Sequence, residues 1–276
     1  MFRLSKHCFL LYNTYKKEVS KMENRYASRI EKVQMSSIRV VMEKVEKLRS
    51  QGKSVVSLCA GEPDFNTPEG IKKATIEALN DNQTHYSSNR GYLGLRKKVA
   101  HLLKEQTTID YDSDTEIIMT CGCSEAINNV CQAFINKMMK LSFLPQLLYL
   151  IKIQFLLCQG IPVEIPLKLS LGFQIDIEEV KNKITKKTKM IILNNPNNPT
   201  GAVYQKETLE QLCKLARENN ILILADEIYN QLDYENQYVS IASFENMKDY
   251  TIIVNGFSKA YAMTGWRMGY IASSQK

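Results

Sequence analysis

The sequence lacks the cysteine and histidine patterns that build disulfide-bonded or zinc-bound scaffolds. Its 276 residues include seven cysteines and three histidines. An odd number of cysteines scattered along a long chain does not form a disulfide framework, so we expect reduced thiols. Cys121 and Cys123 have one residue between them and no histidine nearby, which is not the ligand spacing of a zinc site. We therefore expect neither a disulfide-rich module nor a metal centre.

No uninterrupted apolar run reaches the length of a membrane span. The longest candidate, residues 141–157, contains Pro145, Gln146, Lys152 and Gln154, whereas a spanning helix needs about 20 predominantly apolar residues. Near the N-terminus, the apolar run 8–12 is shorter than the roughly 7–15 residues of a signal-peptide core. We expect a cytoplasmic protein without a membrane segment. Residues 1–21 are interpreted as an extension, with targeting and an upstream start both left open.

Acidic residues are scarce in two segments, and these segments account for the basic character of the chain. The formal net charge is +7. Residues 1–21 hold five basic residues and one acidic residue, and residues 137–160 hold three lysines and no acid. A basic excess favours nucleic acid as a partner when it spreads over a surface. Since the remaining charges balance, we expect no nucleic-acid partner.

The remaining sequence alternates between helical and strand patterns. Apolar residues recur at helical spacing in residues 35–51, 69–80, 92–105, 124–136, 176–184 and 205–219. Short apolar runs predict strands at residues 117–120, 190–194, 221–225, 251–254 and 270–272. Strands that alternate with helices are typical of an α/β fold with a mainly parallel sheet covered on both faces.

Polar side chains follow four of the predicted strands. They belong to the segments that begin at Thr120, Asn194, Ala225 and Asn255. Ligands of such sheets bind at the carboxyl ends of the strands, so we expect these segments to form one site.

The groups in these segments suggest one ligand. Gly122, Cys123 and Ser124 precede a helix, where free N–H groups bind anions, and Arg267 can bind a phosphate with two hydrogen bonds. Asp226 and Tyr229 supply a carboxylate and a phenol, and Lys259 follows an apolar strand, where its pKa falls and its amine becomes a nucleophile. Each group alone also fits an ordinary role as a helix cap or a surface lysine. Together they fit pyridoxal phosphate.

Five motifs, in the order of a known family, then identify the chain as resembling class I/II pyridoxal-phosphate aminotransferases. They are AGEPDFNTP, THYSSNRGYLGLR, NPNNPTG, ADEIY and GFSKAYAMTGWRMG, which begin at Ala60, Thr84, Asn195, Ala225 and Gly256. GEPDF and AMTGWR are most similar to the bacterial-type aspartate aminotransferase subgroup. The resemblance implies a fold-type-I large domain with a mixed, mainly parallel sheet over residues 66–276. It also implies an N-terminal arm and part of a small domain over residues 22–65.

The resemblance also implies roles for individual residues. Lys259 would form the Schiff base and transfer protons, Asp226 would bind the pyridine nitrogen, and Asn198 and Tyr229 would bind the ring hydroxyl. Those that would hold the phosphate are Gly122, Cys123, Ser124 and Arg267, with Tyr86 contributed by the neighbouring subunit. Gly61 and Asn198 would contact the substrate. The family transfers amino groups between amino acids and 2-oxo acids and forms homodimers.

Three departures from the family pattern qualify these expectations. Gly94 replaces an acidic residue. The family continues beyond the lysine signature to a substrate-binding arginine, which we expect to be absent here. Residues 137–159 do not resemble the family text at all. When the codons of Met138 and Met139 are read one base out of frame, they encode part of the Asp-Glu pair that the family has at this place. We therefore predict a frame shift that a second shift near the end of the segment compensates.

This altered segment would place Lys152 in a core strand. We therefore expect the chain to be unstable, with little or no activity. Another reaction of the same coenzyme, or a non-functional gene fragment, remains an alternative to transamination.

Overall fold

The computed structural model describes residues 27–33, 37–58, 61–143 and 149–275. The chain divides into two compact units, residues 1–35 and 36–276. The described part of the first unit contains one short 3-10 helix, η1 (Ser28–Lys32). The second unit contains all other elements discussed below. The extension expected at residues 1–21 lies outside the described residues.

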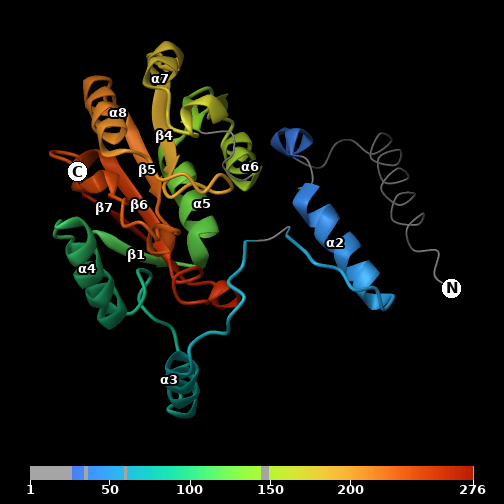
Figure 1. The fold of residues 1–276 in the computed structure, drawn as a ribbon. Coiled ribbons are helices and arrows are strands. Elements are labelled where there is room, and N and C mark those ends of the chain that lie inside the picture. The colour runs from blue at the N-terminus through green and yellow to red at the C-terminus, as the bar shows by residue number, and fades with distance from the viewer. Residues whose placement is uncertain (1–26, 34–36, 59–60, 144–148, 276) are drawn as a thin grey trace. The chain divides into compact units, whose positions relative to one another are not determined.

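Seven strands of the second unit form one mixed, mainly parallel sheet (Figure 1). They are β1 (Ile117–Thr120), β2 (Lys140–Phe143), β3 (Ile161–Glu164), β4 (Thr188–Asn194), β5 (Leu222–Asp226), β6 (Thr251–Gly256) and β7 (Gly269–Ser273). Their order across the sheet is β1-β7-β6-β5-β4-β2-β3. Both pairs made by β7 are antiparallel and the other four are parallel. The predicted α/β class is confirmed.

All six predicted helices are present, with ends that shift by up to two residues from the sequence-based bounds. They are α2 (Ser37–Ser50), α3 (Glu69–Asn80), α4 (Leu93–Thr107), α5 (Gly122–Phe134), α7 (Ile177–Lys183) and α8 (Lys206–Glu218). A seventh helix, α6 (Tyr149–Leu157), was not predicted. Short 3-10 helices follow at η2 (Leu169–Leu171), η3 (Asn230–Leu232), η4 (Ile241–Ser243), η5 (Lys248–Tyr250) and η6 (Thr264–Trp266). The helix expected from residue 124 begins at Gly122, which places three predicted phosphate ligands in its first turn.

Alternating side chains of the central strands pack against helices on opposite faces of the sheet. Met190 and Ile192 belong to one buried cluster with residues of α5 and α6. Ile191 and Leu193 belong to another, with residues of α7 and α8. Burying such a side chain contributes about 1.5–3 kcal/mol, so the two clusters fix the register of β4. A fixed register also fixes the position of the carboxyl end of β4, which follows these buried residues.

Residues 137–160 supply a strand and a helix that the sequence did not predict. β2 lies between β3 and β4, and its Lys140 pairs with Ile161 and Thr188. The expectation that Lys152 occupies a core strand is wrong. It lies on α6 with 44% of its side chain exposed, and its Nζ is 3.0 Å from Glu164 Oε1. A solvated, paired lysine removes that argument for instability. The frame-shift hypothesis itself stays a prediction.

No helix in the described part of the chain combines the length and apolar character needed to cross a bilayer. The apolar segment that raised the question contributes α6, a helix of nine residues.

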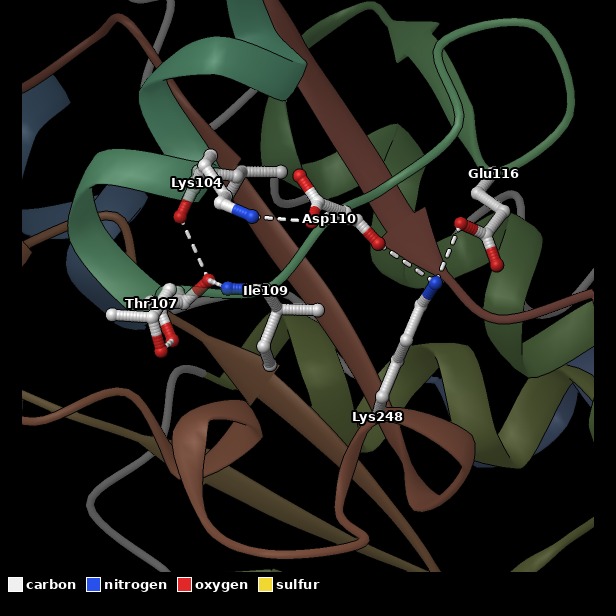
Figure 2. Close-up of polar contacts among 8 residues, drawn as sticks. Lys104, Thr107, Ile109, Asp110, Glu116 and Lys248 are labelled. Atoms are coloured by element: carbon white, nitrogen blue, oxygen red, sulfur yellow. Dashed lines mark hydrogen bonds and ion pairs between the residues drawn. The ribbon is translucent and has the colours of Figure 1, made fainter.

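Lys248 connects the start of β6 to the loop between α4 and β1 (Figure 2). Its Nζ lies 2.8 Å from the main-chain oxygen of Asp110 and 2.8 Å from Glu116 Oε2. The same ammonium lies 5.1 Å from the centroid of the Tyr111 ring. Only 10% of the Glu116 side chain is exposed, so this carboxylate depends on Lys248 for its charge partner.

Candidate active site

The carboxyl ends of β4, β5 and β6 lie side by side. Asn194 pairs with Asp226, and Asp226 pairs with Val254, in the two parallel ladders. Neighbouring strands lie about 4.8 Å apart, so the residues that follow these strands converge within a few ångströms. The sheet therefore brings together three of the four polar segments predicted to form a site. The fourth reaches it through α5, which begins just after β1.

Asp226 is a buried carboxylate at the end of β5, with 4% of the residue exposed. Burial raises its pKa to about 6, while the Ile228 N–H, which donates to Oδ1 at 3.3 Å, and the charge of Lys259 lower it. Within the described residues, that N–H is the one hydrogen-bond donor to this carboxylate. A buried carboxylate in this state favours a cationic partner, so it suits a protonated ring nitrogen.

Lys259 lies three residues after β6 and is half-buried. Its Nζ donates a hydrogen bond to the main-chain oxygen of Gly61 and lies 5.7 Å from the centroid of the Tyr229 ring. Burial lowers the pKa of this amine, and Arg267 lowers it further, against the opposing charges of nearby acidic groups. A lowered pKa increases the fraction of neutral amine, which is the nucleophilic form.

Asn198 and Tyr229 form a directly bonded pair beside Asp226. Asn198 Nδ2 donates to Tyr229 Oη at 2.7 Å. Burial raises the pKa of the Tyr229 phenol, and the charge of Asp226 adds to this effect. The phenol therefore keeps its proton at neutral pH, and because its oxygen already accepts from Asn198, that proton is free to bind an acceptor.

The first turn of α5 lies against Arg267. A side chain on Gly122 would place its Cβ 2.4 Å from Arg267 Nη2, and Gly122 has a φ of +76°. A Cβ on Gly269 would lie 2.7 Å from the carbonyl carbon of Gly122. These close approaches require glycine, and they set a guanidinium beside free N–H groups of a helix start. Both features attract an anion.

Cys123 and Ser124 occupy the same turn with different environments. Burial raises the pKa of the Cys123 thiol well above its ordinary value, and the charge of Asp226 acts in the same direction. The thiol thus adds no negative charge to the anion site. Ser124 is exposed, and its main-chain oxygen accepts from Gln154 Nε2 at 2.9 Å, which ties α6 to the start of α5.

Gly61 reaches the site, whereas Tyr86 does not reach it within this chain. The loop that contains Gly61 packs on the segment after Lys259, where Thr67 Oγ1 donates to the Ala262 main-chain oxygen at 2.5 Å. Residues 62–67, 262 and 264–266 of these segments line a depression of about 600 Å³. Tyr86 is fully exposed, at 106% of the reference area.

Two buried polar residues of the predicted strand-end segments were given no role by the sequence. Glu227 is 3% exposed, and burial raises its pKa to about 7, although Ser240 Oγ donates to its Oε1 at 2.6 Å. Asn194 is 2% exposed and bonds to both Asp226 and Asn198. The sequence did contain signals for them, because an acidic pair and an asparagine stand at the ends of apolar strands. Polar groups at such positions are buried, and they are buried only when they are hydrogen-bonded.

A mixed, mainly parallel sheet with this strand order, and with an amine, a carboxylate and an anion-binding helix start at its strand ends, defines fold type I of the pyridoxal-phosphate enzymes. The model for the family "Aminotransferase class I and II" matches residues 53–276. The chain therefore belongs to the class I and II aminotransferase family, whose members use pyridoxal phosphate.

Individual relatives support this assignment. The aspartate aminotransferase of Bacillus sp. strain YM-2 is 36% identical over 255 residues, which cover 92% of this chain and 65% of that protein. Aromatic-amino-acid aminotransferase 2 of Thermococcus litoralis is 38% identical, with 90% and 63% covered. The crystal structure of aspartate aminotransferase from Thermotoga maritima matches with a TM-score of 0.86 at 33% identity, with 90% and 66% covered. The chain spans just under two thirds of the length of these proteins.

Proposed function

We propose that this chain binds pyridoxal phosphate at the strand-end site and carries the coenzyme-binding part of an aminotransferase. The observation that carries the proposal is the position of Lys259. Its half-buried amine lies beside the Tyr229 ring, at the same strand ends as the buried carboxylate of Asp226. The substrates proposed are an L-amino acid and a 2-oxo acid, in agreement with the names of the relatives.

The residues present fit this coenzyme at each of its polar positions. Asp226 would pair with the ring nitrogen, because a buried carboxylate gains most from a cationic partner. Asn198 and Tyr229 would bind the ring hydroxyl, since both have a donor left over from their mutual bond. The phosphate would lie at the first turn of α5 against Arg267, with the N–H groups of Gly122, Cys123 and Ser124.

When bound, the coenzyme supplies an aldehyde that condenses with amines and a ring that delocalises the electron pair left on the substrate Cα. Lys259 Nζ would hold the coenzyme covalently and, once released by substrate, would move a proton to and from that Cα. The proton on the Tyr229 phenol would stabilise negative charge on the ring hydroxyl. Gly61 would offer its backbone to the substrate carboxylate, since it already lies at the amine of Lys259.

A homodimer is part of the proposal. Tyr86 would reach the phosphate of a second copy, which accounts for a fully exposed tyrosine near the end of α3. α3 itself has no buried residue, and Ile76 and Leu79 are each 58% exposed. Apolar side chains in that state favour burial against a partner. We further propose that residues 66–276 form the large domain, that 22–65 form the arm and part of a small domain, and that the protein acts in the cytoplasm.

A coenzyme titration of the full chain tests the proposal. We expect added pyridoxal phosphate to give the absorbance band of a lysine-bound coenzyme, and borohydride reduction to fix its mass on the peptide that contains Lys259. Lys259→Ala should abolish both signals, while the control Lys206→Ala, on α8, should keep them. Uptake of the label at other lysines, or none at all, would refute the assignment. Because binding is read directly, the expected low activity does not affect the result.

A further inference from the structure

Asn194 is the last residue of β4, and its side-chain amide bonds to both sides of the proposed coenzyme site. Asn194 Nδ2 donates to the main-chain oxygen of Asp226 at 3.1 Å. Asn194 Oδ1 accepts from the main-chain N–H of Asn198 at 2.8 Å. The residue is 2% exposed, so neither bond competes with bulk water. One rigid amide thus spans the residue proposed for the ring nitrogen and a residue proposed for the ring hydroxyl.

The first bond strengthens the end of the β4–β5 ladder. The main-chain oxygen of Asp226 also accepts from the Asn195 N–H at 3.2 Å. Two donors from consecutive residues therefore hold the last carbonyl of β5. They limit the motion of the Asp226 backbone, which determines where its carboxylate points.

The second bond holds the loop that follows β4. Asn198 lies four residues after Asn194, and the chain between them turns back so that the Asn198 N–H donates to the side-chain oxygen Oδ1 of Asn194. The side chain of Asn198 then extends to Tyr229 Oη at 2.7 Å. The position of the amide–phenol pair thus depends on the Asn194 bond.

A side-chain amide is the group that suits this position. It offers a donor and an acceptor at a fixed spacing and carries no charge into a buried site. A carboxylate at the same place lacks the donor and would add a charge close to Asp226. A leucine of similar size would leave the Asn198 N–H without a partner and the Asp226 oxygen with the Asn195 N–H alone. A buried donor without an acceptor costs more than a missing surface bond.

We propose that Asn194 is a positioning residue that sets the spacing between Asp226 and the Asn198–Tyr229 pair. The coenzyme ring is rigid, so its nitrogen and its hydroxyl can both be bound well only if this spacing matches. The inference rests on the proposed function. It adds a residue that acts through its neighbours and touches no reacting atom.

Asn197 provides a matched control in the same loop. It is 3% exposed, and its Oδ1 accepts from Thr200 Oγ1 at 2.7 Å within the loop. Asn194→Ala and Asn197→Ala each remove one buried amide of equal size, so both variants lose stability. Only the first removes bonds to Asp226 and Asn198.

The experiment compares both variants with the parent chain in two measurements. In the coenzyme-free protein, we expect Asn194→Ala to speed hydrogen exchange of the Asn198 N–H at least about tenfold, because its acceptor is gone. In titrations with pyridoxal phosphate, we expect about 10- to 100-fold weaker binding and a shifted pH midpoint of the coenzyme absorbance. Asn197→Ala should leave the pH midpoint unchanged and the affinity within about threefold.

Each outcome decides between the two proposals. Equal losses of affinity in the two variants, with an unshifted pH midpoint, would show a merely structural role and overturn the positioning role. Unchanged exchange at Asn198 in Asn194→Ala would overturn it as well. A parent chain that takes up no coenzyme would refute the proposed function and this inference together, whereas normal parent binding confines the failure to Asn194.

Discussion

The ammonium of Lys259 lies 5.7 Å from the centroid of the Tyr229 ring, with the Tyr229 hydroxyl bonded to Asn198. A cation beside an aromatic face is held by the ring electrons, even where burial disfavours its charge. The phenyl ring and the hydroxyl of Tyr229 therefore do different things. The ring orients the amine, and the hydroxyl belongs to the hydrogen-bonded pair at the ring-hydroxyl position of the proposed coenzyme.

Tyr229→Phe separates these two roles. The ring contact with Lys259 stays, while Asn198 Nδ2 loses its acceptor. We expect weaker coenzyme binding by about tenfold and a higher pKa of the bound coenzyme, because a donor to its hydroxyl oxygen is lost. Absorbance titrations against pH measure both quantities. Tyr234→Phe, which changes an exposed tyrosine, is the control, and identical curves for Tyr229→Phe and the parent would contradict the assignment.

Asp226→Asn should stabilise the coenzyme-free protein while it weakens coenzyme binding. The pKa of Asp226 is raised from 3.8 to about 6, so between these pH values the folded state binds more protons than the unfolded state. The stability that comes from the protonated Asp226 carboxyl is therefore fully present below pH ~4. It is lost as the pH rises through ~6, which lowers the free energy of unfolding by at most about 3 kcal/mol. The variant should be more stable than the parent at pH 7. Its free energy of unfolding, measured with urea at several pH values, should depend less on pH than that of the parent.

The exposed Asp81→Asn is a control for that measurement. In the Asp226→Asn variant, Glu227 still makes stability fall as the pH rises, because its pKa is also raised, from 4.5 to about 7. The difference in stability between the parent and Asp226→Asn isolates the effect of this carboxyl. If that difference shows the parent gaining stability between pH 4 and 6, the raised pKa is contradicted. Coenzyme affinity unaffected by Asp226→Asn would contradict the proposed pairing with the ring nitrogen.

Mixing two defective variants tests the proposed dimer. If Tyr86 serves the site of the other subunit, a hybrid of Lys259→Ala and Tyr86→Ala subunits has one doubly altered site and one intact site. We expect coenzyme binding with parent affinity to reappear after the variants are unfolded, mixed and refolded together. Light scattering gives the mass of the assembly. If Tyr86 acts within its own chain, the hybrid has no intact site and the mixture shows no recovery.

Lys248→Met should destabilise the fold without a direct effect on coenzyme affinity. It removes the ammonium shared by the Asp110 carbonyl and Glu116, as Figure 2 shows, and leaves the nearly buried Glu116 carboxylate without its charge partner. We expect a loss of about 1–3 kcal/mol in urea unfolding at neutral pH. Lys104→Met breaks the exposed pair with Asp110 and should cost less than about 1 kcal/mol. Equal losses in the two variants would contradict this interpretation.

The nucleotide sequence of the codons for residues 137–159 tests the frame-shift hypothesis. We expect a one-base change of frame to restore an Asp-Glu pair followed by prolines and an aromatic residue. The structure gives this segment a strand and a helix, with Lys152 paired to Glu164, so instability no longer follows from Lys152. Soluble expression of the chain measures that stability. If no shifted frame encodes such a sequence, the frame-shift hypothesis is wrong and the segment has diverged from the family.

Secondary structure was predictable where the local pattern was strong. β1 (Ile117–Thr120) and α3 (Glu69–Asn80) have the bounds that the sequence predicted, because apolar spacing and turn residues act over a few positions. β2, β3 and α6 were missed, since the mainly apolar segment 137–160 and the short run after it show neither a helical nor a strand period. The tertiary pairing of β2 with β3 and β4 decides its conformation, in agreement with the context dependence of strand formation.

The sequence by itself determined which chemical groups are available to the proposed site. It indicated Lys259, Asp226, Tyr229, Asn198 and Arg267, because each follows a predicted strand or lies in a recognisable motif. Only the tertiary structure decided their spacing and environments. The lateral ladder brings Asn194 to Asp226, the burial of Asp226 raises its pKa to about 6, and the amide of Asn194 connects two strand ends that lie 32 residues apart in the chain. Hydrogen bonds between strands and removal from water depend on neighbours distant in sequence, so no local pattern encodes them.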